Sequence, residues 1–379
     1  MGVGALYVHV PFCARKCRYC DFASKATRTD DPCMDGYLKE RIAELDRCQR
    51  LGMLGSCKTA YLGGGTPTFL GATRLGTLVS RIRMTCPNLT EFSCEANPDS
   101  LTDEVIEALC GAGVTRVSIG VQSLDDEELR ALGRIHTANQ ARTRVQAAIA
   151  AGLDVSVDLM CAIPKQTDES WRQTIHEVIA LSVGHVSVYP LAIEEGTPFG
   201  KRYGDETPPW NDEDVQAQRM ECAERLLTGA GLHRYEVASY AREGKQCAHN
   251  IAYWTGIPYL GLGPGAASML DASCYDSARR LYDWLPPRPH EASRMRFSTL
   301  DREVEFLSAR EAWAEDLMLG MRLTRGVEEE RLDAVPDTRD DLLARGLVER
   351  DGDRLIPTHD GWLLGNELFA ALWDLHQQS

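Results

Sequence analysis

Apolar residues in the first half of the chain follow two alternating patterns. Short apolar runs are typical of β-strands, and longer runs with apolar residues three or four positions apart are typical of amphipathic helices. From Ala5 to about Leu191, the two kinds of run alternate about six times. The predicted strands are ALYVHV (5–10), KTAYLGG (58–64), LTEFSCEA (89–96), VTRVSIGV (114–121), LDVSVDLM (153–160) and HVSVYPLA (185–192). The helical segments between them include 35–48, 102–113, 139–152 and 168–181.

Strict alternation of strand and helix predicts parallel strands joined by right-handed crossovers. Six such units form either an open doubly wound sheet or a partial barrel. Unusual residues decide between them, because they follow the predicted strands one after another. They are a cysteine loop, the GGGTPT segment, Glu95 with Asn97, Gln122, and Asp158. In barrels the chemistry gathers at the carboxyl ends of the strands, so we expect an α/β fold built on a partial (β/α)6 barrel.

The pattern changes after Pro198. The segment GDETPPWND predicts a hinge before a helix at about 212–229, and a mixed segment follows. The aromatic and proline-bearing stretch 273–299 predicts an irregular connector or a hairpin. The last block ends in GLVERDGDRLIPTHDGWLLGNELFAALW (346–373), which predicts a hairpin and a terminal helix, as in winged-helix modules. We therefore expect a barrel domain at 1–200, an extension at 201–300 and a small winged-helix-like domain at 301–379.

Composition limits the classes of partner. Hydrophobic residues make up 44% and charged residues 26% of the chain, as in an ordinary globular protein. The formal net charge of −15 disfavours binding to nucleic acid and allows at most peripheral contact with an anionic membrane. No apolar run reaches the roughly 20 residues that span a bilayer, and no signal peptide fits before the first predicted strand.

Thirteen cysteines without an export signal indicate a reducing, cytoplasmic compartment, where they stay thiols or bind metal. Most are expected to lie apart from one another and to behave as small hydrophobic residues. These are Cys33, Cys48, Cys57, Cys86, Cys110, Cys161, Cys222 and Cys274.

Cys13, Cys17 and Cys20 form a C-x3-C-x2-C loop directly after the first predicted strand. A structural zinc site normally needs four ligands, so a remote fourth ligand such as Cys247 or His249 is one interpretation. The other is an iron-sulfur cluster held by three thiolates, with one iron left open for chemistry.

The stretch YVHVPFCARKCRYCDFAS resembles the N-terminal signature of the radical S-adenosylmethionine superfamily, and within it the anaerobic coproporphyrinogen oxidase-like family. The resemblance implies a 4Fe-4S cluster on Cys13, Cys17 and Cys20, with S-adenosylmethionine chelating the open iron. It also places Tyr7 and Tyr19 in contact with that cofactor.

Further residues match this resemblance. In GGGTPT, Gly64, Gly65 and Thr66 would bring the main chain close to the cofactor, because glycine permits close backbone approach. A tight structural turn is the alternative. The remaining positions that the resemblance assigns to S-adenosylmethionine are Glu95, Gln122, Arg134 and Asp158, each of which, taken alone, could be an ordinary surface group.

Two features bear on the member of the family. The oxidase carries a fourth cysteine where this chain has Phe22, which weighs against oxidase activity. The segment HNIAYW (249–254) resembles the HNxxYW signature of haem chaperones of the HemW type, which implies haem binding through His249. Chemically, histidine can ligate haem iron and aromatic residues can cover a macrocycle. A core histidine beside buried aromatics is the alternative.

The resemblance implies a haem chaperone that passes haem to an acceptor protein, for example a respiratory one. It also implies an electron donor such as flavodoxin or ferredoxin. The alternatives are an oxygen-independent coproporphyrinogen III oxidase and a radical methyltransferase, so enzymatic activity stays open at this point.

Overall fold

Six parallel strands form the centre of one large sheet in the computed structural model, which describes residues 2–204 and 206–377. Neighbouring strands pair in the order β1, β4, β5, β6, β7, β8. The expected (β/α)6 arrangement is therefore confirmed, and the strand bounds differ from the predicted ones by at most a few residues. The strands are β1 (Ala5–Val10), β4 (Thr59–Gly64), β5 (Glu91–Ala96), β6 (Arg116–Gln122), β7 (Asp154–Cys161) and β8 (His185–Pro190).

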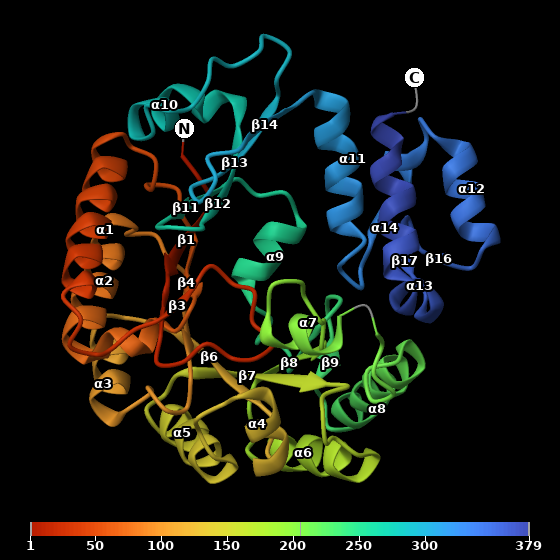
Figure 1. Ribbon diagram of the computed structural model, residues 1–379. Helices are drawn as coiled ribbons and strands as arrows, with labels where there is room; N and C mark the ends of the chain where they lie inside the picture. Colours follow the sequence, from red (N-terminus) through yellow and green to blue (C-terminus); the bar gives the residue numbers. More distant parts are fainter. Residues whose placement is uncertain (1, 205, 378–379) are drawn as a thin grey trace.

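Helices cover the outer side of this curved sheet (Figure 1). They bury the apolar side of each strand, for example Leu62, Phe92 and Val117, against helical residues such as Leu78 and Ile175. The helices are α1 (Cys33–Arg50), α2 (Gly71–Thr85), α3 (Asp103–Gly111), α4 (Asp126–Leu132), α5 (Ala138–Ala150) and α6 (Asp168–Ala180).

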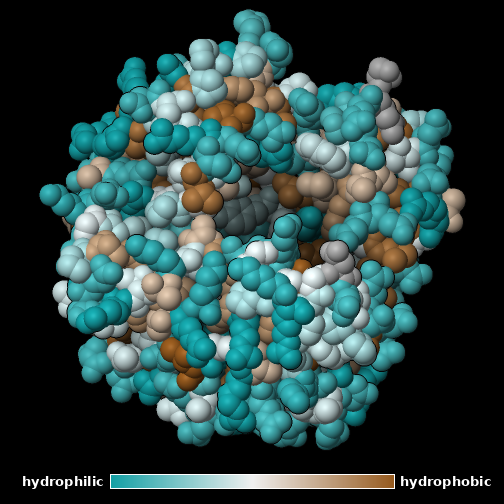
Figure 2. All heavy atoms as spheres, viewed as in Figure 1, coloured by the Kyte–Doolittle hydropathy of each residue, from teal (hydrophilic) through white to brown (hydrophobic). Residues whose placement is uncertain are grey.

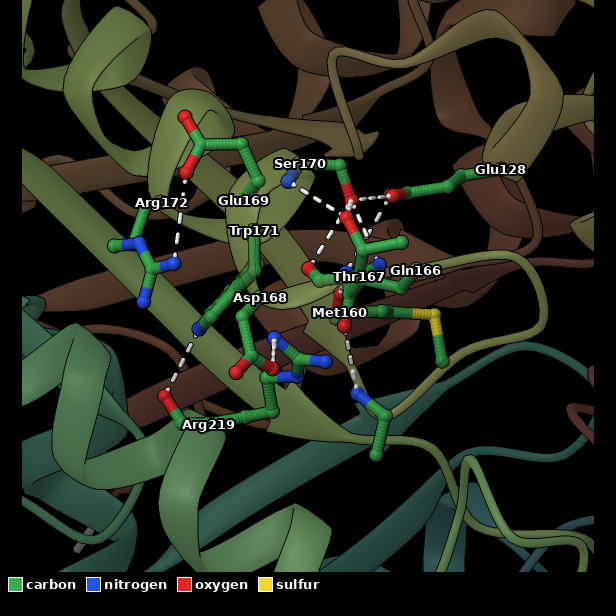
Figure 3. A network of polar contacts seen from close by, with 11 residues as sticks. Glu128, Met160, Gln166, Thr167, Asp168, Glu169, Ser170, Trp171, Arg172 and Arg219 are labelled. Atoms are coloured by element: carbon green, nitrogen blue, oxygen red, sulfur yellow. Dashed lines mark hydrogen bonds and ion pairs between the residues drawn. The ribbon is translucent and has the colours of Figure 1, made fainter.

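The start of α6 shows how side chains cap a helix at its N-terminus (Figure 3). Thr167 and Ser170 form a capping box, in which each side chain accepts a hydrogen bond from the other residue's backbone amide. The buried carboxylate of Glu128 accepts from Ser170 Oγ at 2.5 Å. The indole of Trp171 donates to the carbonyl of Arg219 at 2.9 Å, which ties α6 to α8 (Glu213–Gly229).

Strands from later in the chain extend the sheet at both edges, to twelve strands in the described residues. At one edge β11 pairs in parallel with β1, and β12, β13 and β14 follow antiparallel. At the other edge β10 and β9 follow β8. The bounds are β9 (His233–Arg234), β10 (Ser239–Ala241), β11 (Tyr259–Leu262), β12 (Ala267–Asp271), β13 (Arg294–Ser298) and β14 (Val304–Leu307). The segment 201–300 thus shares the sheet of the barrel, and the expected domain boundaries stay a prediction.

Short helices connect these added strands. They are α7 (Pro198–Tyr203), α9 (Ala248–Trp254) and α10 (Tyr275–Leu281). The stretch expected to be a connector or hairpin contains α10 and β13, and β13 pairs with strands on both of its sides.

The last block has its own core around Leu317, Leu342, Leu355 and Leu368. Its order of helix, short strand, helix and hairpin agrees with the winged-helix-like expectation, and Figure 1 shows it beside the barrel in blue. A hydrogen bond of 2.9 Å from Trp362 Nε1 to the carbonyl of Val237 joins the two parts. The elements are α11 (Ala309–Gly320), β15 (Val327–Glu328), α12 (Pro336–Ala344), β16 (Val348–Asp351), β17 (Arg354–Pro357), α13 (His359–Leu363) and α14 (Gly365–Trp373).

All thirteen cysteines are free thiols. The expectation that Cys57 and Cys86 lie apart from other cysteines is wrong, because each is close enough to shift the pKa of the other: the Cys86 thiol raises the pKa of Cys57, and the Cys57 thiol lowers that of Cys86. They meet because Cys57 precedes β4 and Cys86 ends α2, and both ends lie at the same end of the barrel wall. Within residues 2–204 and 206–377, no helix is both long enough and apolar enough to cross a bilayer.

Candidate functional site

A cavity of about 370 Å³ opens at the carboxyl ends of the barrel strands and reaches into the barrel. The face drawn in Figure 2 is hollowed near its centre, close to where Figure 1 draws α9. The structure brings most of the predicted residues to this cavity. Those that line it are Cys13, Cys17, Cys20, Tyr19, Gly64, Gly65, Thr66, Glu95, Gln122, Arg134 and Asp158. Tyr7 and His249 are not among its lining residues.

The three cysteines of the loop after β1 are partly exposed and line one side of the cavity. Hydrogen bonds from Thr66 Oγ1 to Cys13 Sγ and from Arg134 Nη1 to Cys17 Sγ, each 3.5 Å, reach two of the sulfurs. Donors of this kind stabilise negative charge on cluster thiolates. Burial raises the pKa of the Cys13 and Cys20 thiols, so ligation of iron would have to displace their protons.

Across the described residues, no three His, Cys, Asp or Glu side chains converge on a position for one metal ion. A cubane does not need such convergence, since each thiolate binds a different iron. The loop itself is held by backbone hydrogen bonds, from Arg18 N to the Leu132 carbonyl (3.0 Å) and from Phe199 N to the Arg18 carbonyl (2.9 Å). The donor set therefore fits an iron-sulfur cluster.

Each glycine of the GGGTPT segment avoids a specific steric conflict. A Cβ at Gly63 would lie 2.9 Å from Glu95 Oε1, and one at Gly65 would lie 2.7 Å from the Phe12 carbonyl. Gly64 has φ of +105°, and a Cβ there would lie 2.4 Å from the His9 ring. The glycines thus let β4 approach the cysteine loop and the neighbouring strands. The Gly64 amide also donates to Glu95 Oε2 at 3.0 Å.

Glu95 and Asp158 place two carboxylates on the same cavity. Burial, reinforced by the charge of Asp158, raises the pKa of Glu95 to about 7. Burial likewise raises the pKa of Asp158, whose oxygens accept from Ser118 Oγ at 3.0 and 3.1 Å. A positively charged ligand group between these carboxylates would relieve their repulsion and favour their ionised forms.

Arg134 joins the cysteine loop to the cavity wall. Its Nη2 donates to Asn97 Oδ1 and to the Gly120 carbonyl, both at 2.6 Å. The absence of a side chain at Gly120 makes space for this guanidinium, since a Cβ there would lie 3.3 Å from Arg134 Nη2. Beside it, the pairing of β6 with β7 shifts between Gly120 and Gln122, and Gln122 has φ of +66°. A bulge and a strained non-glycine residue are typical of functional sites.

His249 is buried in the barrel wall, with 1% of its surface exposed. Its Nδ1 pairs with the Thr59 hydroxyl and its Nε2 with the Tyr253 hydroxyl, both at 2.9 Å. The imidazole stacks on Tyr61, with centroids 5.1 Å apart and planes at 23°. Burial lowers the pKa of His249 to about 3, so the ring is neutral. The structure thus shows the core-histidine arrangement, and haem ligation by His249 stays a prediction.

Tyr7 lies behind the cavity wall beside the same aromatic group. Its hydroxyl pairs with His9 Nδ1 at 3.2 Å, and its ring stacks on that of Tyr61 with centroids 6.4 Å apart. Tyr61 lines the cavity, so Tyr7 supports the wall through its neighbour.

The helix α9 carries the HNIAYW segment and closes the inner end of the cavity. The carboxylate of Glu91 accepts from the amides of Ala248 (2.7 Å) and His249 (3.1 Å) at the start of α9, as an N-terminal carboxylate does for a helix. Of the HNIAYW segment Asn250 lines the cavity, as does Cys247 directly before α9. Trp254 instead faces the last block of the chain, where the Arg322 guanidinium lies 5.2 Å from its ring.

Sequence reasoning missed several cavity residues on the barrel strands, namely Tyr61, Arg116, Ser118, Ser156, His185, Ser187 and Tyr189. A signal for them exists in the sequence. In β6 the polar Arg116, Ser118 and Gln122 alternate with apolar residues, and the same alternation recurs in β7 and β8. Period-two polarity in a strand whose outer side packs on helices predicts a polar barrel interior.

A partial (β/α)6 barrel with a three-cysteine loop after its first strand defines a protein of the radical SAM class. Residues 7–178 match the family model described as the Radical SAM superfamily. The protein named heme chaperone HemW of Mycobacterium tuberculosis is 35% identical, over 97% of this chain and 94% of that protein. The protein of the same name of Bacillus subtilis is 32% identical, over 96% and 98%. The chain belongs to the HemW family of radical SAM proteins.

A solved structure shares the fold. Coproporphyrinogen III oxidase (HemN) from Escherichia coli, described as a radical SAM enzyme, matches with a TM-score of 0.75 over 100% of this chain and 91% of that chain. At 20% sequence identity this match shows a common fold and no more.

Proposed function

We propose that this protein is a haem chaperone, which binds haem together with an S-adenosylmethionine-chelated 4Fe-4S cluster and transfers haem to an acceptor protein. One observation carries the proposal. The cysteine loop lines the same cavity as Cys247 and Asn250, of which Asn250 belongs to HNIAYW, although more than 220 residues separate them in the chain. A ligand in this cavity can therefore contact both.

The residues at the cavity rim suit S-adenosylmethionine. Glu95 and Asp158 offer carboxylates to a cationic or hydroxyl-bearing ligand, and Gly65 and Thr66 bring the main chain close. Arg134 and Gln122 complete the polar wall. Bound to the three thiols, the cluster would supply one electron to the sulfonium, and the residues of this chain bind and orient the cofactor beside it.

Haem binding through His249 requires a local rearrangement. One ring nitrogen would have to exchange its hydrogen bond, with Thr59 or with Tyr253, for iron. The Tyr253 bond lies within α9 itself, four residues away, so rotation of the Tyr253 side chain would release Nε2 while keeping the Thr59 and Glu91 contacts. Tyr61, stacked on His249 and lining the cavity, provides an aromatic surface for a macrocycle.

The oxidase alternative lacks the fourth cysteine that the oxidase carries. Phe22 lines the cavity and is 61% exposed at the position of the oxidase's fourth cysteine. A phenyl ring cannot bind iron, but it offers an apolar surface at the entrance.

The cysteine loop suits an acidic electron donor such as flavodoxin or ferredoxin. Arg15, Lys16 and Arg18 are exposed there, and in the part of the chain that the structure describes none of them forms an ion pair. This local positive charge stands out in a protein of net charge −15, and opposite charge speeds association. Free thiols throughout favour a cytoplasmic location, and the haem acceptor is a protein, for example a respiratory one.

The test is a haem titration of the anaerobically reconstituted full chain, with product analysis in parallel. Stoichiometric haem binding, loss of iron-sulfur absorbance in Cys17→Ser and transfer of haem to an apo-haem protein support the proposal. Cys161→Ser, a buried cysteine outside the cavity, is the control. Protoporphyrinogen formed from coproporphyrinogen would select the oxidase, and a methylated product with S-adenosylhomocysteine would select the methyltransferase.

A further inference from the structure

The inner end of the cavity, defined by Arg116, Cys247 and Asn250, carries a buried cation that no assignment so far uses. Arg116 begins β6 and lines the cavity with 5% of its surface exposed. Its Nη1 donates to the carbonyl of Lys245 at 3.1 Å, and among the described residues the guanidinium forms no ion pair. Burying a guanidinium without a partner anion is costly. Among the described residues its Nε and Nη2 have no acceptor, and the side chain lines the cavity.

Asn250 adds a second donor at the same place. Its Oδ1 accepts from Cys247 Sγ at 3.5 Å, and within residues 2–204 and 206–377 its Nδ2 amide has no acceptor. The inner end thus presents a guanidinium and an amide NH2 to the cavity. This pair matches an anionic group with two oxygen atoms, since arginine pairs with carboxylates through two parallel hydrogen bonds.

Two carboxylates interact electrostatically with Arg116, but both accept hydrogen bonds from other donors. They are Glu91, whose charge raises the pKa of Arg116, and Asp158, whose pKa the charge of Arg116 lowers in part. Glu91 accepts from the amides of Ala248 and His249, and Asp158 accepts from the hydroxyl of Ser118. They offset the charge of the guanidinium at longer range but leave its donors available to a ligand.

We infer that Arg116 and Asn250 bind a carboxylate of the ligand, and that this carboxylate is a propionate of the haem. The inference rests on the proposed function. The carboxylate of S-adenosylmethionine is the other source, but it belongs at the cluster. Arg116 and Gln122 stand at opposite ends of β6, about 20 Å apart at roughly 3.3 Å per residue. A macrocycle lying along the cavity with its propionates at Arg116 would keep them far from the cysteine loop.

The test compares ferric haem with its dimethyl ester, in which both propionates are esterified. The full chain, reconstituted anaerobically, is titrated with each ligand as wild type, Arg116→Gln, Arg116→Lys and Asn250→Ala. Arg172→Gln, an exposed arginine on α6, is the matched control. We expect Arg116→Gln to weaken haem binding by about 10- to 100-fold, the size of a charge-assisted hydrogen bond, and to change ester binding by less than about threefold. Arg116→Lys should restore part of the loss, and Asn250→Ala should weaken haem alone.

S-adenosylmethionine affinity, measured on the same samples, separates the two carboxylate sources. It should be unchanged in Arg116→Gln, and a large loss there would overturn the inference in favour of the amino acid carboxylate. Equal losses for haem and for its ester, or no loss for haem, would also overturn it while leaving the chaperone proposal standing. A wild-type chain that binds neither porphyrin would end both. If Arg116→Gln fails to take up the cluster, Asn250→Ala, which leaves the Lys245 contact intact, decides.

Discussion

The imidazole of His249 lies against the ring of Tyr61, with centroids 5.1 Å apart, and its Nε2 is hydrogen-bonded to the hydroxyl of Tyr253. Tyr61 lines the cavity, whereas His249 does not. The geometry gives His249 a structural role in the barrel wall and makes haem ligation by the same ring dependent on releasing one nitrogen.

Tyr253→Phe tests that dependence. Removing the hydroxyl frees Nε2 and costs about 1 kcal/mol of unfolding free energy for the lost hydrogen bond. If His249 ligates haem iron, we expect Tyr253→Phe to bind haem at least as tightly as wild type, while His249→Ala loses binding. Soret titrations and denaturant melts measure the two effects. Haem binding that survives His249→Ala would show that the histidine only supports the wall.

The raised pKa of Glu95, about 7, predicts a pH dependence of S-adenosylmethionine binding. The ionised carboxylate attracts the cationic ligand, so binding should weaken as the pH falls from 8 to 6, by up to about tenfold per pH unit below the pKa. Calorimetry in buffers of different ionisation enthalpy should also detect proton release on binding.

Glu95→Gln is the control, because it should bind weakly with a flat pH profile. Ionisation of the buried carboxyl has a cost in the unliganded protein. Since its folded pKa of about 7 lies above the ordinary value of 4.5 for a glutamate, this group's contribution to stability is full at low pH and is lost as the pH rises through 7. A pH-independent affinity in wild type would contradict the assignment of Glu95 to the cofactor.

Glu91 holds the start of α9 against the barrel through two amide hydrogen bonds. Glu91→Ala should destabilise the protein by about 1 to 3 kcal/mol, since it removes acceptors from buried donors. Haem affinity should fall with it, while iron content stays constant, because the cysteine loop does not contact Glu91. Glu91→Gln, which keeps an acceptor oxygen, should have a stability and a haem affinity between those of wild type and Glu91→Ala. Glu107→Ala on the exposed side of α3 is the control.

Arg294 and Glu315 form a buried ion pair of 2.7 Å between β13 and α11, with 8% and 4% of their side chains exposed. Glu315→Ala leaves Arg294 with Asp316 as its partner and also releases Arg296. We expect a loss of about 3 kcal/mol, as for other broken buried pairs. Urea unfolding measures it, and a loss below about 1 kcal/mol would show that Asp316 compensates. Exposed Glu349→Ala is the control.

Local sequence determined the barrel and most of its rim. Strand and helix periodicity, turn glycines and the order of elements follow from interactions a few residues apart, so the six strands and the winged-helix-like block could be predicted from them. Most rim residues between Cys13 and Asp158 were predictable because they lie at or just after the carboxyl ends of predicted strands, and parallel strands bring such ends together. Their specific roles came from the resemblance of short motifs.

Tertiary structure alone decided what surrounds the segment 247–254. Whether His249 or Asn250 faces the cavity depends on how α9 docks onto Glu91, Thr59 and Arg116, which are more than 130 residues away in the chain. No local pattern encodes that orientation, because a short helix can present any of its sides to a barrel. The extension of the sheet by β11 to β14, and the meeting of Cys57 with Cys86, were hidden for the same reason: such contacts arise only when distant elements pack together.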